Sequence, residues 1–174
     1  MNFRLINRDE IEKLRKIDRS EIITHIYHYV NGKLLLREEY YNLLGWDQTE
    51  LNNLLKRLYI IFDRGGTFYG AFNNSSMIGL VSLNNQFIGK NKDQLQIVSL
   101  HVSKNFRKKG IGKALFDIAK EKAKKLGAKK LYISATPSKN TVEFYMQLGC
   151  KLAKEINKEL FELEPEDIHL EFKF

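Results

Sequence analysis

Apolar positions recur with two different periods along this chain, and the change of period separates predicted strands from predicted helices. Residues 3–8 alternate as a short strand would. After them, the spacing of Ile11, Leu14 and Ile17 places three apolar side chains on one face of a helix, and Asp9 stands at the expected N-cap. The N-terminal segment is therefore predicted to be a strand followed by an amphipathic helix.

A β-hairpin and a second helix are predicted next. Asn31 and Gly32 separate two arms rich in β-branched and aromatic residues, which is the strongest short-range signal for a hairpin. Residues 24–41 are therefore expected to form two paired strands. Leucines at helical spacing then predict a helix over residues 49–62, and a pair of glycines after it ends the pattern.

The second half of the chain alternates between strands and helices. The apolar face of its longest predicted helix comprises Ile111, Leu115, Ile118 and Leu126. The other predicted elements are strands at residues 67–72, 77–83, 95–102 and 129–135, a helix at 138–149 with Ser138 as N-cap, and an edge or hairpin strand at 167–174. This order predicts a mixed α/β or α+β sheet in a single domain that spans residues 1–174.

Composition agrees with a soluble globular domain, because 174 residues with 43% hydrophobic and 29% charged positions can bury a substantial core. No apolar run reaches the roughly 20 residues that span a bilayer, and the N-terminus lacks the apolar region of a signal peptide. No membrane partner and a cytoplasmic location are therefore expected. Cys150 is the only cysteine, so an internal disulfide and a thiolate-rich metal site are excluded, and no metal is expected.

The net charge of +8 is concentrated in one segment. Residues 104–130 contain eleven Lys or Arg against two acidic residues, which gives +9 and leaves about −1 for the rest of the chain. A concentration of this kind favours one compact anionic partner near the segment, although a polyanion would also be attracted to it.

Spacing excludes two phosphate motifs for the glycine-rich segment NFRKKGIGKAL, residues 105–115. A P-loop requires glycine where Arg107 stands, and Ser or Thr after Lys113, where Ala114 stands. A dinucleotide-binding fingerprint requires a third glycine in place of Leu115. What remains is a glycine-rich turn between a strand and a helix, where unpaired N–H groups and the helix dipole bind anions.

Arg107, Gly110 and Gly112 match the signature R/Q-x-x-G-x-G/A, and FYMQLG at residues 144–149 is similar to a second common motif of the same family. In these residues and in the order of its elements, the chain resembles the GNAT superfamily of N-acetyltransferases over residues 77–152. The resemblance implies a mixed, mostly antiparallel central sheet that is splayed between two parallel strands and flanked by about four helices. The predicted N-terminal β-hairpin would be an addition to this fold.

The resemblance also implies an activity, which is direct transfer of an acetyl group from acetyl-CoA to a primary amine in a ternary complex. Acetyl-CoA would lie between the strands at 95–102 and 129–135, and Tyr145 aligns with the family's general-acid tyrosine. Where many relatives have asparagine this chain has Ser138, and Asn140 is the shifted alternative. The implied cofactor-binding residues are Leu100, His101, Val102, Arg107, Lys108, Lys109, Gly110, Ile111, Gly112, Lys113, Ser138, Asn140 and Tyr145.

The sequence does not locate the general base. Gln96 occupies the position at which some relatives carry a strand glutamate, and an amide cannot accept the proton. Asp18 and Glu21 fit a helix capping box better than a catalytic pair. Period-two alternation places His101 on the strand face opposite Gln96. The other weak candidates are His25, His28, Glu38 and Glu39.

The predicted hairpin has three interpretations. Its aromatic residues would wall an amine site or form the contact of a homodimer, and aromatic pairs also pack simply against each other. The residues concerned are Tyr27, Tyr29, Tyr40, Tyr41 and Trp46.

Two alternatives to an enzyme remain at this stage. Gln96 would suit a non-catalytic acyl-CoA sensor, and the lysine-rich helix would suit a nucleic-acid-binding module, although no helix-turn-helix, zinc or RNP signature supports the second. Nucleic acid is therefore not the expected partner. The expected acceptor is a small-molecule or peptide amine, and the basic net charge argues mildly against a polyamine.

Overall fold

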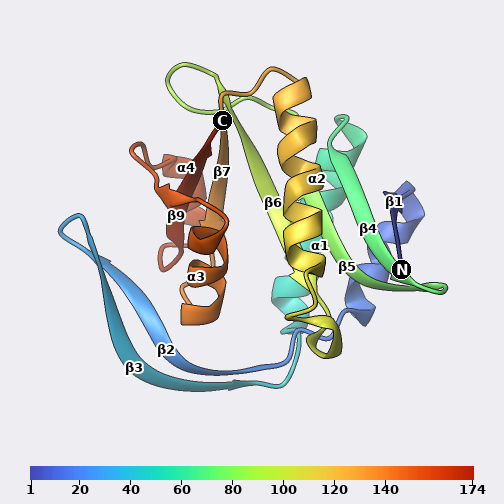
Figure 1. The fold of residues 1–174 in the computed structure, drawn as a ribbon, viewed down its shortest axis with the longest axis horizontal. Coiled ribbons are helices and arrows are strands. Elements are labelled where there is room, and N and C mark those ends of the chain that lie inside the picture. The colour runs from blue at the N-terminus through green and yellow to red at the C-terminus, as the bar shows by residue number, and fades with distance from the viewer.

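A computed structural model describes all residues, 1–174, and contains a seven-stranded sheet, a separate two-stranded hairpin and six helical segments (Figure 1). Only β6 and β7 of the large sheet run parallel, and all its other neighbouring strands are antiparallel. The predicted mixed, mostly antiparallel sheet is therefore confirmed. In spatial order its strands are β1 (Asn2–Leu5), β4 (Thr67–Asn73), β5 (Ser76–Leu83), β6 (Gln94–Val102), β7 (Lys130–Ala135), β9 (Ile168–Lys173) and β8 (Lys151–Leu152).

The parallel pair opens into a V. Pairing between β6 and β7 begins at Gln94 with Lys130 and ends at Ile97 with Ile133. Beyond this point each strand continues without the other, and Figure 1 shows the two diverging toward the end where α3 (Lys139–Gln147) lies. The splay leaves one edge of β6 without a strand partner.

Helix α2 (Ile111–Lys125) connects β6 to β7 and covers one face of the sheet (Figure 1). The predicted apolar face is partly wrong, because Leu126 is 42% exposed and Ile118 is only half-buried. The buried side chains of α2 recur every four residues, and a row with this spacing turns gradually around the helix, away from Ile118 and Leu126. This row, with Phe116 beside it, consists of Ile111, Leu115, Phe116, Ala119 and Ala123.

The opposite face is covered by α1 (Gln48–Asp63) and by a 3₁₀ helix, η1 (Arg8–Lys16). Ile11, Leu14 and Ile17 are buried as predicted. The predicted cap is wrong, since Asn7 is the N-cap and the helix begins before Asp9. The Glu10 side chain completes a capping box by accepting a hydrogen bond from the Asn7 N–H, so the helix begins at Arg8, directly after Asn7.

The hairpin is formed by β2 (Glu21–Val30) and β3 (Lys33–Leu43), and it is longer than predicted. Asn31 (φ 50°) and Gly32 (φ 81°) both adopt the left-handed conformation that a type I′ turn requires. The hairpin crosses the end of the sheet at which β6 and β7 diverge (Figure 1). It is attached there through β2, because the Tyr27 N–H donates to the Pro137 carbonyl at 2.8 Å.

The C-terminal segment differs from its prediction. β9 is not an edge strand, since it pairs with β7 along its length and with β8 on its other side. Its pairing partner is more than thirty residues away in the sequence, so the local alternation could not place it. The remaining helical segments are η2 (Lys104–Phe106) and α4 (Lys158–Leu163). None of the helices combines the length and the hydropathy needed to cross a membrane.

The two faces of the sheet differ in polarity along β7 and β9. The face toward α2 carries apolar side chains such as Leu131, Ile133 and Ile168. Alternation then places polar side chains on the face toward α1, where they form a band near the point of splay. The band comprises Tyr132 and Ser134 of β7, Asp167 just before β9, and His169 and Glu171 of β9.

Candidate active site

The turn before α2 presents main-chain N–H groups that have no partner within the protein. None of the six N–H groups from Lys108 to Lys113 donates to a main-chain or side-chain acceptor. Lys108 (φ 60°) and Gly110 (φ 79°) are both left-handed, which curves the turn so that its N–H groups converge. Because these groups also lie at the positive end of the α2 dipole, the turn is suited to hold an anion.

Gly112 permits the close approach of α2 to α3 beside this turn. A Cβ at Gly112 would lie 3.2 Å from a ring atom of Phe144 and 3.8 Å from Cγ2 of Val102. A Cβ at Gly110 would meet nothing within 4 Å, so Gly110 is required by its backbone conformation alone. The two glycines of the signature therefore have different physical roles.

Arg107 fixes the position of the turn. Its guanidinium donates to three main-chain carbonyls, those of Val102 (2.9 Å), Ser20 (3.1 Å) and Asp18 (3.2 Å). These bonds join the end of β6 to the segment that enters the hairpin. The Arg107 side chain thus holds the loop in place, and the N–H groups that follow it are the ones left free to bind a ligand.

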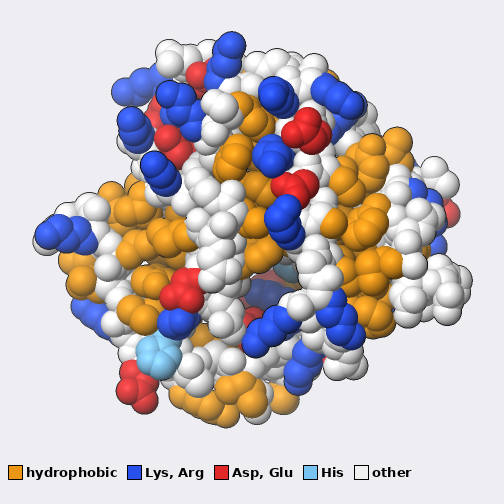
Figure 2. Space-filling view, viewed as in Figure 1, with side chains coloured by type: hydrophobic (Ala, Val, Ile, Leu, Met, Phe, Trp, Pro, Cys, Tyr) orange, Lys and Arg blue, Asp and Glu red, His pale blue; other side chains and the backbone are white.

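Positive charge surrounds the turn. Lys108 and Lys109 are exposed, and the Lys109 ammonium lies 5.3 Å from the centre of the Phe106 ring. Lys113 pairs with Asp117 at 2.6 Å and remains 64% exposed. Figure 2 shows Lys and Arg side chains gathered at this end of α2, beside a hollow between α2 and α3. A polyanion that entered the hollow would therefore meet both cations and free N–H groups.

The open edge of β6 faces the inside of the V. The Ser103 N–H donates to the Ile78 carbonyl of β5, so alternation directs the main-chain groups of Leu100 and Val102 to the other side. The Val102 carbonyl is used by Arg107, while the N–H groups of Leu100 and Val102 have no strand opposite them. An extended ligand can pair with this edge as an additional strand would.

A β-bulge changes the predicted orientation of His101. The register between β5 and β6 shifts between Ser99 and Ile97, which inserts Val98 as an extra residue. Leu95 and Ile97 before the bulge, and Leu100 after it, pack on the α2 side. His101 therefore lies on the same face as Gln96, which corrects the prediction that it would lie opposite. Sequence alternation missed this because a bulge reverses the parity of every later side chain.

The His101 side chain is placed to line the acceptor face of the sheet. Its ring packs edge-on against the Trp46 ring, and the two ring centroids are 4.9 Å apart. Burial, together with the charges of Arg19 and Arg107, lowers the pKa of His101 to about 3. The imidazole is therefore neutral at physiological pH and cannot serve as a cationic donor.

Tyr145 lies in α3 with its hydroxyl free. The side chain is 5% exposed. Its ring packs against those of Phe144 and Phe116, with centroid-to-centroid distances of 5.1 Å and 6.2 Å. No protein group forms a hydrogen bond with the hydroxyl. Burial raises the pKa of Tyr145 well above its ordinary value, and the nearby Cys150 and Asp167 add to the shift. The phenol is therefore a neutral hydrogen-bond donor without an internal acceptor.

Ser138 and Asn140 are already occupied by other contacts. The Ser138 hydroxyl is the N-cap of α3, donates to Thr141 at 2.9 Å and is 1% exposed. Asn140 donates its side-chain N–H to Glu21 at 2.9 Å. Ser138 is thus confirmed as the N-cap of α3. Asn140 would have to break its hydrogen bond with Glu21 to contact the pantetheine arm.

The predicted capping box at residues 18–21 is wrong. No helix begins there, because Glu21 pairs with Leu43 as the first residue of β2. The Asp18 carboxylate accepts instead from the Ser20 N–H at 2.9 Å. Pairing across the hairpin extends the strand into the segment and overrides the local signal.

The other weak base candidates lie away from the V or have partners. His25 contacts Thr24, Glu38 is exposed, and His28 pairs with Glu39 across the hairpin. Gln96 is 5% exposed, and its amide cannot take a proton. None of these residues supplies a carboxylate at the point of splay.

Asp167 supplies a carboxylate at the point of splay, although no motif in the sequence marks this residue. Its Oδ2 accepts from the Ser134 hydroxyl at 2.8 Å, and Ser134 is the first β7 residue beyond the pairing with β6. Burial, together with the charge of Glu164, raises the pKa of Asp167 to about 6, while the Ser134 hydrogen bond and the charges of Arg19 and Arg57 oppose the rise. The only signal in the sequence was a carboxylate just before a strand, which is common on loops.

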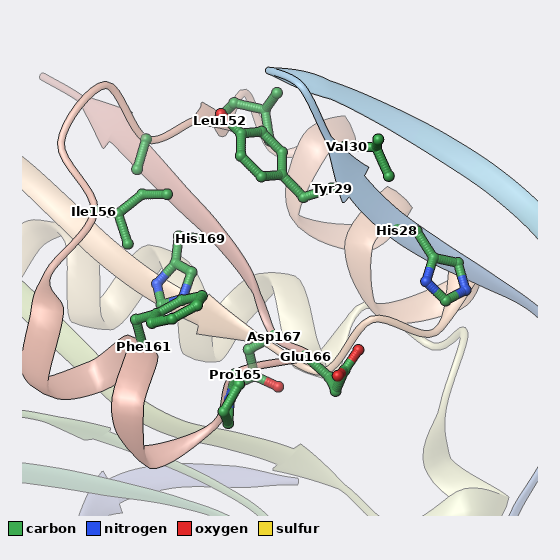
Figure 3. Close-up of a pocket in the computed structure, with 11 residues that line it drawn as sticks. His28, Tyr29, Val30, Leu152, Ile156, Phe161, Pro165, Glu166, Asp167 and His169 are labelled. Carbon is green, nitrogen blue, oxygen red and sulfur yellow. The ribbon is translucent and has the colours of Figure 1, made fainter.

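A cavity of about 150 Å³ opens beside Asp167, between β2 of the hairpin and the β8–α4–β9 segment (Figure 3). Figure 3 shows side chains of the hairpin facing those of α4 and of the start of β9 across it. The hairpin therefore forms one wall of a cavity, while its roles as the wall of an amine site or as a homodimer contact remain predictions. Its lining residues are His28, Tyr29, Val30, Leu152, Ala153, Ile156, Phe161, Pro165, Glu166, Asp167 and His169.

Comparisons with known proteins agree with this geometry. Nourseothricin acetyltransferase superposes with a TM-score of 0.72 at 14% identity, over 99% of this chain and 97% of that chain. A putative streptothricin acetyltransferase from Bacillus anthracis str. Ames, in complex with acetyl coenzyme A, gives 0.67 at 18% identity over 99% of each chain. The PaiA N-acetyltransferase from Thermoplasma acidophilum, in complex with coenzyme A, gives 0.63 at 17% identity over 100% of each chain.

The structural matches show the fold. No curated protein sequence matches the chain. The model of the acetyltransferase (GNAT) family matches residues 32–150, which is more than half of the chain. With the signature turn and the splayed parallel strands in place, the chain belongs to the GNAT family of acetyltransferases.

Proposed function

We propose that this protein transfers an acetyl group from acetyl-CoA to a primary amine by direct attack in a ternary complex. The observation that carries the proposal is the row of free N–H groups from Lys108 to Lys113 at the mouth of the V. Two of the similar structures contain acetyl-CoA or CoA, which supports the same donor here.

The donor is bound by two sets of main-chain groups. The amides from Lys108 to Gly112 receive the pyrophosphate, and the open edge of β6 at Leu100 and Val102 pairs with the pantetheine arm. Lys108 and Lys109 contribute charge, at about 0.3–1 kcal/mol for each exposed contact. Directional N–H donors select the shape of the pyrophosphate, and the lysines mainly strengthen the attraction.

Tyr145 stabilises the leaving group. As the amine attacks, negative charge develops on the thioester oxygen and then on the departing sulfur. A neutral phenol with no internal acceptor donates a hydrogen bond to that sulfur. The burial that raises the pKa of Tyr145 also raises the proton affinity of a thiolate beside it, so the two groups remain matched.

The donor proposal is tested by binding. Acetyl-CoA should raise the melting temperature of the protein and give saturable binding in calorimetry, and dephospho-CoA or free adenosine should bind more weakly. Release of CoA should then be detected with at least one amine of a broad panel, and the acetamide product identified by mass. Absence of saturable acetyl-CoA binding would contradict the proposal.

A further inference from the structure

Asp167 stands where the acceptor side of the V begins. Ser134, its hydrogen-bond partner, is the residue at which β7 leaves β6, and its side chain lies on the face opposite α2. Asp167 is also close enough to Tyr145 for its charge to affect that phenol. Oδ1 of Asp167 accepts no hydrogen bond from the protein and is not sealed from solvent. One carboxylate oxygen is thus fixed by Ser134 and the other is available to a ligand.

The cavity beneath the hairpin lies next to this carboxylate. Asp167 lines the cavity together with Tyr29 of β2, Ala153 of the segment after β8 and Phe161 of α4 (Figure 3). A volume of about 150 Å³ is enough for a group of about six carbon atoms, since an engineered cavity of this size holds benzene. The cavity therefore has room for a short chain attached to an amino group.

The lining of the cavity includes two carboxylates, those of Asp167 and Glu166, and no Lys or Arg, in a chain whose net charge is +8. Glu166 lines it, and Glu39 supports the lining residue His28 from the neighbouring strand. Glu164 lies near enough to affect the pKa of Asp167. The charge of the lining is therefore suited to an alkylammonium ion, although the net charge of the whole chain argues mildly against a polyamine.

We propose that Asp167 binds the amino group of the acceptor and accepts its proton, and that the cavity beneath the hairpin holds the remainder of the acceptor. This assignment rests on the acetyltransferase function proposed above. It supplies the base that Gln96 cannot be.

The protons and electrons balance as follows. The acceptor enters as an ammonium ion and gives one proton to Oδ1 of Asp167. The nitrogen lone pair forms the N–C bond with the thioester carbon, and the C–S bond breaks with its electron pair on sulfur. The second nitrogen proton reaches the sulfur through the Tyr145 hydroxyl, and Asp167 releases its proton to water. The net products are the acetamide, CoA thiol and one proton.

The charged and polar groups that face Asp167 come from five elements or loops. They are Ser134 of β7, Tyr145 of α3, Arg57 of α1, Arg19 of the segment before β2, and Glu164 of the loop after α4. The arginines favour the carboxylate, whereas burial and Glu164 favour the neutral acid. The balance keeps Asp167 ionised above about pH 6, the range in which a base is needed.

The test compares Asp167→Asn with Glu159→Gln, a carboxylate-to-amide change at an exposed position of α4. Acetyl-CoA binding is measured first by calorimetry, and kinetics then use primary alkylamines of three to seven carbons. Asp167→Asn should lower kcat/KM for the amine by about 10²-fold or more and leave acetyl-CoA binding unchanged. The wild-type pH profile should bend near pH 6, and the bend should be missing in Asp167→Asn only.

A second variant tests the cavity itself. Ala153→Leu should raise KM for the amine several-fold while KM for acetyl-CoA stays the same. If Asp167→Asn keeps the wild-type kcat/KM and the bend in the pH profile, the assignment of Asp167 is overturned. Acetyl-CoA binding by the same protein would still support the proposed function. Failure of every amine to bind or react with the acetyl-CoA-saturated wild type would also overturn the assignment.

Discussion

The two sides of the active site are built in opposite ways. The donor side is one continuous segment, in which the turn from Lys108 to Lys113 carries its N–H groups and its charge within six residues. The acceptor side is assembled from Ser134 and Asp167, which are 33 residues apart, and from Tyr145 and a cavity walled by the hairpin. The proposed donor contacts therefore lie close together in the chain, whereas the proposed acceptor contacts are brought together only by the fold.

The difference also explains how each side can vary. Main-chain N–H groups bind a pyrophosphate whatever side chains flank them, so the donor turn tolerates substitution at Lys108 and Lys109. The acceptor side depends on particular side chains held by distant contacts, such as the Ser134–Asp167 bond. A change in the hairpin can alter the cavity and leave the donor turn intact.

The largest effect is expected where the two sides meet, at Tyr145. Tyr145→Phe keeps the ring that packs against Phe116 and Phe144 but removes the hydroxyl that we propose as the donor to the departing sulfur. We expect kcat to fall about 10²-fold, with little change in melting temperature. Tyr69→Phe, on β4 and far from the V, is the control and should leave kcat unchanged. Equal kcat values in the two variants would remove Tyr145 from the mechanism.

Asp167→Asn should also change stability, which separates the acceptor side from the donor side. The pKa of Asp167 is raised to about 6 in the folded protein from an ordinary 3.8, so the folded state binds more protons between these values. Wild-type stability therefore falls as pH rises from about 4 to 6, and the Asn variant should lack this loss. We expect it to be about 1–2 kcal/mol more stable at pH 7, after allowance for solvent screening. Urea unfolding at pH 4, 5, 6 and 7 measures the difference, which should disappear at pH 4.

A matched pair of glycines tests the donor turn. Gly110 (φ 79°) and Gly127 (φ 93°) lie at the two ends of α2, and a Cβ at either would meet nothing within 4 Å. Gly110→Ala and Gly127→Ala should each cost about 1 kcal/mol of stability, because both force alanine into a left-handed conformation. Only Gly110→Ala should weaken acetyl-CoA binding, by about tenfold, since it disturbs the converging amides. Similar affinities in calorimetry would show that the turn does not hold the donor.

The smallest effect is expected from the flanking cations. Lys108→Ala and Lys109→Ala should each weaken acetyl-CoA binding by about 0.3–1 kcal/mol at low salt, and the difference from wild type should shrink as salt rises. Lys124→Ala, at the far end of α2, is the control. Loss of all binding in either lysine variant would mean that charge, and not the amide row, dominates on the donor side.

Features with a short sequence range were predicted correctly. Asn31 and Gly32 form the hairpin turn, Ser138 caps α3, and the turn at Gly110 opens α2, because each depends on the conformational preferences of a few neighbouring residues. The order of the other strands and helices was equally accessible from the periods of the apolar positions, but η2, β8 and α4 were not predicted. These features are enough to identify the fold class and the donor turn.

Features that depend on distant pairing were missed. The bulge at Val98 arises from the register of β5 against β6, and it turns His101 to the face of Gln96. Pairing with Leu43 made Glu21 a strand residue, and pairing with β7 moved β9 from the edge to the interior of the sheet. No local pattern contains this information, because it depends on which segments meet.

The sequence by itself determined the turn that we propose to hold the donor, since a signature of six residues contains both its amides and its charge. Only the tertiary structure decided the proposed acceptor side. Asp167 became a half-buried carboxylate with a raised pKa because the fold shields it from bulk water, while its hydrogen bond from Ser134 opposes the rise. Desolvation and proximity are consequences of packing, and a carboxylate in a sequence carries neither until the chain has folded around it.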